Sequence, residues 1–237
     1  MKKSRLLMLL PVFLLVGCAK SINKEEAAAK AKEINEYQAA HPVTEFKFEL
    51  SSSEDYNGVK EESKVAYEFS EEKVFFHVSS EEGEDKTDLY GYKNSDKYYV
   101  VNAVAKQYYE FGEEAKEQFD NAIKGQKQNI QHMFDGYAAV DIDGLLTHYV
   151  QVEGAEVEYS TKGDGQLSIE VSWKGEAEGM TGTLECKAVW EDYYPAELSF
   201  KMEGSGNGQS IKEEMSAKFE YSVSPSYPSL ADFTKLN

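Results

Sequence analysis

Residues 89–111, LYGYKNSDKYYVVNAVAKQYYEF, indicate the class of fold to expect. They contain three short runs rich in tyrosine, valine and phenylalanine, at 89–92, 97–101 and 106–111. Aromatic and β-branched residues favour strands, and Asn94-Ser95-Asp96 is a turn sequence. Consecutive strands with short turns and no helix between them form an antiparallel meander, not a parallel sheet.

The same pattern continues on both sides of this stretch. Upstream, Phe46, Phe48 and Leu50 alternate with polar residues and predict one apolar strand face. The segment 51–63 contains the turn dipeptide Asn57-Gly58 and is expected to be a loop or an irregular hairpin. The tail 224–237 is expected to be irregular. Further strands are expected at 65–69, 73–78, 155–161, 167–173, 183–190, 197–203 and 211–223.

Helical periodicity separates the two series of strands. Apolar residues recur at helical spacing over 113–134, and Asp141 is a suitable N-cap for a second helix. Both helices are amphipathic, so each needs an apolar surface to cover. A further helix is predicted at 24–40, which is rich in Ala, Glu and Lys and ends at His41-Pro42. This first helix fits either a solvated stalk or a helix laid against the sheet.

The first twenty residues, MKKSRLLMLLPVFLLVGCAK, have the layout of an export signal. Positive residues precede an apolar run that is too short to span a membrane. The run ends in Leu15-Val16-Gly17-Cys18, which resembles the lipobox of bacterial lipoproteins. The resemblance implies a diacylglyceryl group on the Cys18 sulfur and cleavage after Gly17. We therefore expect a signal peptide at 1–17, a tether at 18–24 and a single domain at 25–237, which the resemblance described next implies to be half-barrel-like.

The order of elements behind the lipobox resembles that of the LolA/LppX-like lipoproteins and lipoprotein carriers. The resemblance implies an α+β fold: a strongly curved antiparallel sheet of about 10–11 strands, an unclosed barrel, with two or three helices on its concave face. It also implies a hydrophobic cavity that holds an acyl chain or a similar ligand between sheet and helices. The helix residues expected to line it are Phe119, Ile123, Ile130, Met133, Phe134, Leu145, Leu146 and Tyr149.

Composition limits the kinds of partner. The chain has 25 Lys+Arg against 43 Asp+Glu, a formal charge of −18. This balance argues against binding nucleic acid or anionic lipid headgroups. We interpret the acidic residues as a solvated extracellular surface rather than a cation-binding one. The anchor should make the membrane a partner, through lipid on Cys18.

No catalytic constellation is recognisable, so we do not expect an enzyme. The four histidines are scattered without metal-ligand spacing, and we expect neither a metal nor a cofactor. If Cys18 carries lipid, Cys186 has no partner for a disulfide, and we expect it to be a small core residue. Asp141-Ile142-Asp143-Gly144 lacks the remaining ligands of a calcium loop and is interpreted as a helix cap.

Two functions fit these expectations. The first is an anchored domain that binds or carries a lipid or another apolar molecule in the cavity. The second is a structural or protein-interaction surface lipoprotein with a filled core and no ligand. The volume and lining of the space beside residues 113–151 would distinguish them.

Overall fold

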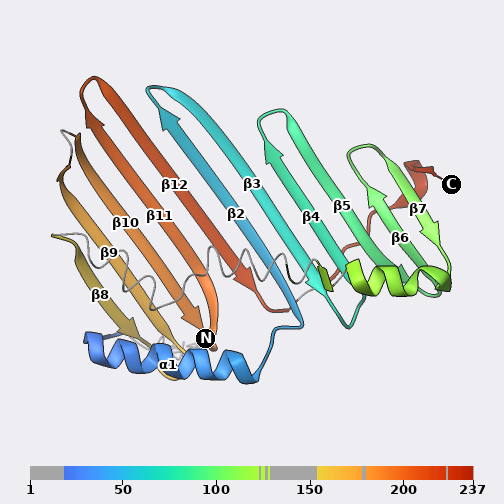
Figure 1. Cartoon of the computed structure of the whole chain (residues 1–237), viewed down its shortest axis with the longest axis horizontal. Coiled ribbons are helices and arrows are strands. Elements are labelled where there is room, and N and C mark those ends of the chain that lie inside the picture. The colour runs from blue at the N-terminus through green and yellow to red at the C-terminus, as the bar shows by residue number, and fades with distance from the viewer. Residues whose placement is uncertain are drawn as a thin grey trace, which may run out of the picture.

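The computed structural model describes residues 19–122, 124, 125, 128, 154–177, 180–222 and 224–236. They form one open, curved sheet of thirteen strands, in the order β1-β8-β9-β10-β11-β12-β2-β3-β4-β5-β6-β7-β13 (Figure 1). The strands are β1 (Lys20–Ile22), β2 (Glu45–Tyr56), β3 (Val59–Ser70), β4 (Phe75–Glu82), β5 (Asp85–Asn94), β6 (Lys97–Asn102), β7 (Gln107–Phe111), β8 (Glu156–Thr161), β9 (Leu167–Ala177), β10 (Met180–Glu191), β11 (Tyr194–Gly206), β12 (Gln209–Glu220) and β13 (Thr234–Lys235).

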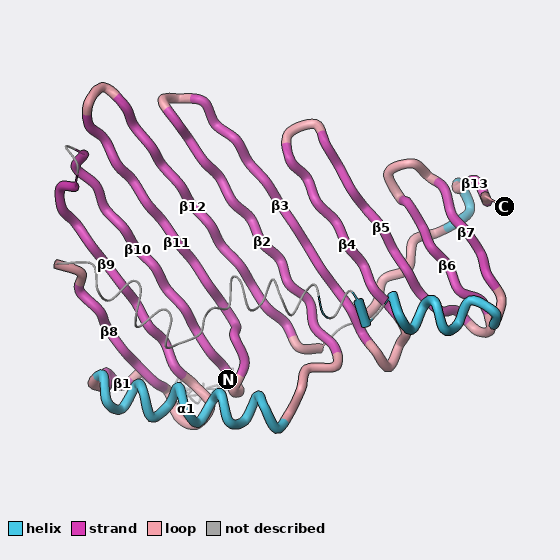
Figure 2. Tube along the Cα trace, viewed as in Figure 1, coloured by secondary structure: helices cyan, strands magenta, loops and turns pink. Residues whose placement is uncertain are grey.

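Two antiparallel meanders lie side by side in this sheet. One runs from β2 to β7 and the other from β8 to β12, and they join where β12 pairs with β2 (Figure 2). The chain therefore leaves the first meander at one end of the sheet and enters the second at the other. Short strands cover both edges, because β1 pairs with β8 and β13 pairs in parallel with β7.

The strand register puts apolar side chains on one face of the sheet and polar side chains on the other. Most buried apolar side chains lie on one face, which we call the apolar face. One row across it consists of Ile169, Ala188, Leu198, Ala217 and Leu50, each opposite the next on adjacent strands. The alternation expected for Phe46, Phe48 and Leu50 is confirmed, with both phenylalanines 4 % exposed.

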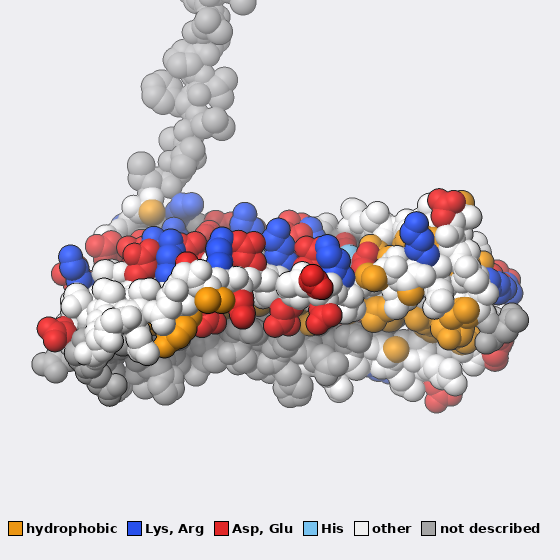
Figure 3. All heavy atoms as spheres, turned by 90° about the horizontal axis from the view of Figure 1, so that it is seen from above, with side chains coloured by type: hydrophobic (Ala, Val, Ile, Leu, Met, Phe, Trp, Pro, Cys, Tyr) orange, Lys and Arg blue, Asp and Glu red, His pale blue; other side chains and the backbone are white. Residues whose placement is uncertain are grey.

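The other face, which we call the polar face, carries charged and hydroxyl side chains in register. Figure 3 shows Lys and Asp or Glu side chains next to one another along it. One row crosses nine adjacent strands and consists of Glu158, Glu170, Lys187, Ser199, Ser216, Ser51, Lys64, Glu81 and Lys86. The period of two is uninterrupted in the parts of the strands that contribute to this row, so the row is continuous across the sheet.

Helix α1 (Lys24–Ala40) lies against the apolar face, near the ends of β8 to β11 (Figure 1). Its start is fixed by a capping box between Asn23 and Glu26. Ala27, Ala31 and Ile34 are buried in the main core, so this helix packs on the sheet and is not a solvated stalk. At its end the Tyr37 ring lies at stacking distance from both His41 and Tyr193, with ring centroids 4.1 and 4.0 Å away.

A second cluster lies on the polar side of the opposite end of the sheet. Phe75, Tyr92 and Val101 are buried there, and Leu230 and Phe233 of the C-terminal segment pack against them. Phe76, the neighbour of Phe75, packs against the main core on the apolar face. The prediction that the strand at 73–78 carries apolar residues on both faces is therefore confirmed.

Three parts of the predicted architecture need correction. The sheet has thirteen strands and not 10–11, because β1 and β13 lie in segments expected to be a tether and an irregular tail. Residues 51–63 continue β2 and β3 around a turn in which Asn57 and Gly58 both have positive φ. The polar alternation there lacks the apolar signal that identifies a strand.

The helices also differ from the prediction of two or three on a concave face. In the described part of the chain there are two α-helices, α1 and one at residues 116–122, which follows the 3₁₀ turn η1 (Glu113–Ala115). They lie near the ends of the strands at opposite ends of the sheet (Figure 2). Since α1 buries only a narrow stripe of three apolar residues, it covers a few strands rather than the whole face. The helix expected after Asp141 lies outside the described residues.

Replacing Ile34 by alanine tests the docking of α1. Ile34 has 0 % of its surface exposed, so Ile34→Ala is expected to lower the free energy of unfolding by about 2–5 kcal/mol. The matched control is Asn35→Ala, an exposed neighbour on the same helix, which should change it by less than about 0.5 kcal/mol. Denaturant unfolding of both variants measures the difference, and equal effects would contradict this packing.

Candidate functional site

Of the predicted ligand-binding residues, only Phe119 is among the residues that the structure describes. Phe119 lies on the helix at 116–122, is 5 % exposed, and has its ring 5.1 Å from the ring of Tyr98 on β6. It therefore packs between helix and sheet. The other residues predicted for the cavity and the anchor lie outside the described residues: Gly17, Cys18, Ile123, Ile130, Met133, Phe134, Leu145, Leu146 and Tyr149.

The apolar face extends beyond the strands that α1 contacts. Leu50, Tyr67 and Met215 are half-buried and pack at the margin of the main core. Farther along the strands toward the hairpin tips, Leu184, Phe200 and Met202 are also half-buried. These side chains form a continuous surface because Leu184 faces Met202 and Phe200 faces Met215 across neighbouring strands.

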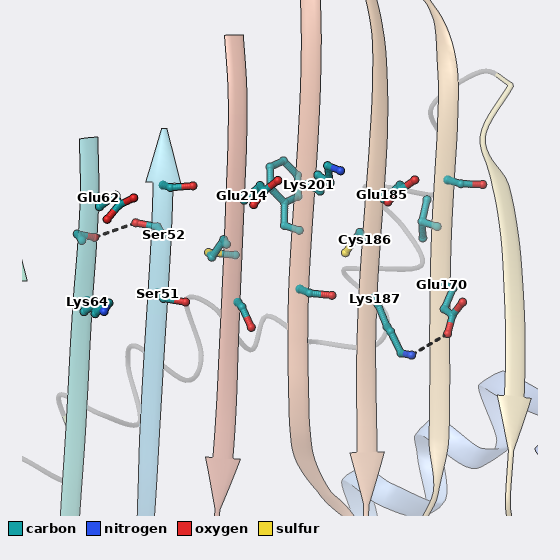
Figure 4. A pocket seen from close by; sticks show the side chains of 18 of the residues that line it. Ser51, Ser52, Glu62, Lys64, Glu170, Glu185, Cys186, Lys187, Lys201 and Glu214 are labelled. Carbon is teal, nitrogen blue, oxygen red and sulfur yellow. Dashed lines mark hydrogen bonds and ion pairs between the residues drawn. The ribbon is translucent and has the colours of Figure 1, made fainter. Parts of the chain in front are cut away.

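The polar face contains two adjoining hollows, which together we call the serine trough. The first, of about 820 Å³, runs from Glu158 on β8 to Lys64 on β3 (Figure 4). The second, of about 690 Å³, continues toward Asp88 and Tyr90 on β5. Ser51, Lys64 and Ser216 line both hollows, so the two are continuous.

Serines account for the depth of the trough. Ser199, Ser216 and Ser51 face one another on three adjacent strands, with Lys187 and Lys64 on either side in the same row. A serine side chain is much shorter than the Lys and Glu side chains around it, so the row is lowest at its centre. Sequence reasoning missed this row because its members lie far apart in the chain and only the strand register brings them together.

A group of ionisable residues lies at the far end of the trough. His77 Nε2 is 2.8 Å from Asp88 Oδ1, and His77 Nδ1 is 3.8 Å from Glu68 Oε2. The Tyr90 ring stacks on the His77 ring with centroids 4.1 Å apart. These residues come from β3, β4 and β5 and are mostly shielded from solvent, since the side chains of Glu68 and His77 are 15 % and 17 % exposed.

Burial changes the ionisation of two members of this group. It raises the pKa of Glu68, an effect that nearby His77 and Lys47 partly oppose. Burial, together with the Asp88 carboxylate, also raises the pKa of Tyr90 to about 12. Tyr90 is therefore a neutral hydroxyl at physiological pH, with its ring face against His77.

The remaining nucleophile and metal candidates do not assemble a reactive centre. Cys186 is 6 % exposed on the apolar face, and burial raises the pKa of its thiol to about 11, so little thiolate is present at neutral pH. Within the described ranges, no cluster of His, Cys, Asp and Glu has the geometry to hold a metal ion. Every helix among these residues is too short or too polar to cross a membrane.

Comparisons with known proteins place the chain in no family. No family model matches it, and no curated protein matches it. An uncharacterized conserved protein from Thermus thermophilus overlaps with it at a TM-score of 0.28 and 10 % identity, covering 87 % of this chain and 99 % of its own. A DUF1329 family protein from Desulfovibrio piger overlaps at a TM-score of 0.21 and 10 % identity, covering 84 % of this chain and 95 % of its own. Scores this low carry no argument about function.

The buried carboxyl of Glu68 predicts a pH-dependent stability. Because its pKa in the folded protein is raised, the folded state holds this proton more tightly, and stability falls as pH rises above the ordinary range of a glutamate. Glu68→Gln removes that cost, so we expect the free energy of unfolding at pH 8 to rise by on the order of 1 kcal/mol. The gain should shrink toward pH 4, where Glu68 is mostly protonated in both states.

Thermal unfolding from pH 4 to pH 8 provides the measurement. Glu62→Gln on the same strand is the control of opposite sign, because Lys60 lowers the pKa of that exposed carboxyl. It should leave the midpoint at pH 8 unchanged or slightly lower. A Glu68→Gln protein that is less stable than the parent at pH 8 would show that the carboxylate is held favourably by His77.

Proposed function

We propose that this chain is a membrane-anchored extracytoplasmic lipoprotein that binds or carries a lipid or another apolar ligand between its sheet and its helices. The export signal and the lipobox ending at Cys18 support the location. Two acyl chains on one residue meet the requirement for stable anchoring that a single chain does not. The order of elements, which resembles that of LolA/LppX-like proteins, supports the class of ligand.

The observation that carries the ligand proposal is the extent of the apolar face. It spans the strands from β8 to β4, whereas α1 buries its narrow apolar stripe near one end of β8 to β11. Leu184, Phe200 and Met202 lie beyond the main core and keep partly accessible side chains. A broad, one-sided apolar surface of this kind suits a flexible, non-directional ligand such as an acyl chain.

A specific observation favours a second function. The main core contains buried side chains from α1 and from both meanders, including Ile34, Phe48, Ile169 and Trp190. Burial of these apolar side chains stabilises the sheet without any contribution from a ligand. In this alternative the chain is a structural or protein-interaction surface lipoprotein, and its partners contact the outer faces of the folded domain.

The anchor is tested by metabolic labelling. Cells that express the chain and receive labelled palmitate should incorporate the label into the wild-type protein and not into Cys18→Ser, because the thiol is the acceptor. Cys186→Ser is the matched control and should retain the label, since that thiol is buried in the fold. An unlabelled wild-type protein would exclude acylation, and a labelled Cys18→Ser protein would assign it to another residue.

The ligand is tested by native mass spectrometry of the chain extracted under mild conditions. A copurified lipid is expected with the wild type, and Phe200→Gln should reduce its occupancy at least threefold by placing an amide on the apolar face. Lys201→Gln is the control, since it introduces the same residue one position along β11 on the opposite face. No bound lipid, or equal loss in both variants, would favour the filled-core alternative.

A further inference from the structure

The charged and hydroxyl side chains of the serine trough lie on the face opposite the proposed lipid surface. Its first hollow crosses the strands from β8 to β3. Six strand spacings of roughly 4.8 Å give that hollow a length of about 29 Å. A site of this shape, long and open, fits an extended polymer that lies across the strands better than it fits a compact small molecule.

Hydroxyl groups without partners line the centre of the trough. Among the described residues, the hydroxyls of Ser51, Ser199 and Ser216 make no hydrogen bond. Ser52 and Ser63, which also line the first hollow, already bond to each other with their oxygens 2.8 Å apart. Each free hydroxyl can both donate and accept. The hydroxyls of Ser199, Ser216 and Ser51 lie on adjacent strands and so repeat at the strand spacing, which is comparable with the length of one sugar ring.

The charges of the trough exclude strongly charged polymers. Lys64, Lys187 and Lys201 line the first hollow together with the acids Glu62, Glu158, Glu170, Glu185 and Glu214. Lys187 is already paired with Glu170 at 3.1 Å. The acidic excess repels a polyanion, and the interspersed lysines break up any continuous anionic surface for a polycation. Charged side chains of both signs, interspersed with hydroxyls, offer the donors and acceptors that an uncharged ligand rich in hydroxyls needs.

An aromatic surface lies at the far end of the trough. The Tyr90 ring is half-buried, lines the second hollow and is supported by its stack on His77. Aromatic rings provide flat apolar surfaces against which the C–H faces of sugars pack, while the polar neighbours bind the hydroxyls. Asp88, held by His77 at 2.8 Å, is a carboxylate acceptor beside this ring.

We propose that the serine trough binds a linear, uncharged glycan lying across the strands. The free hydroxyls of Ser51, Ser199 and Ser216 and the Glu and Lys side chains beside them bond to the sugar hydroxyls. Tyr90 packs against a terminal ring. The proposal is independent of the lipid surface, because the two sites use opposite faces of the same strands.

Isothermal titration of the purified full chain with a hexamer of β-1,4-linked N-acetylglucosamine tests this site. Saturable binding to the wild type is expected. The variant Ser51→Val/Ser199→Val/Ser216→Val removes the three hydroxyls and retains strand-forming residues, and it should weaken binding at least tenfold. The control Ser205→Val/Ser210→Val alters a facing serine pair on β11 and β12 outside the trough and should bind like the wild type.

Two further measurements protect the test against a folding defect and a wrong ligand class. If the valine variant fails to unfold cooperatively, Ser199→Ala/Ser216→Ala replaces it, with an expected loss of at least threefold. Tyr90→Leu should also weaken binding, since it removes the ring face. The proposal is overturned if the hexamer does not bind, if the trough variants bind like the wild type, or if heparin or oligolysine binds more tightly than the hexamer.

Discussion

The pairing of β12 with β2 holds the two meanders together as one sheet. Residues 211–220 lie beside residues 47–56, so strands separated by most of the chain become neighbours. The Phe48 and Phe219 rings approach to 5.1 Å across this junction, and Ala217 faces Leu50. Without it, each meander would expose an unpaired strand edge and carry only part of the apolar face. With it, one continuous surface results on each side of the sheet.

Continuity on both sides gives the two faces separate roles. Along each strand, one set of side chains builds the core beneath α1 and the next set builds the rows of Ser, Lys and Glu. The apolar rows cross the junction from Leu198 to Ala217 and Leu50, and the serine row crosses it from Ser199 to Ser216 and Ser51. A shift of one residue in this register would exchange the two faces. The same pairing therefore positions both proposed binding surfaces.

Local patterns in the sequence predicted much of the fold and little of the site. Alternating apolar residues located the central strands, and the open antiparallel sheet is confirmed. The short edge strands β1 and β13 gave no such signal, because strands of three and two residues contain too few positions to show a period. The ends of β2 and β3 also gave no signal, because the side chains on both faces are polar there. The serine row could not be read from the chain, since it exists only in the pairing of β11, β12 and β2.

Both edges of the sheet are covered by short strands, β1 and β13. Strand β13 covers β7 through backbone bonds from Thr234 to the Lys106 carbonyl at 2.9 Å and from Leu236 to the Tyr108 carbonyl at 2.8 Å. Without β13 the backbone of β7 would be an exposed edge, which is a template for a strand of another molecule. The short strand β13 therefore keeps the backbone of β7 paired within the same chain.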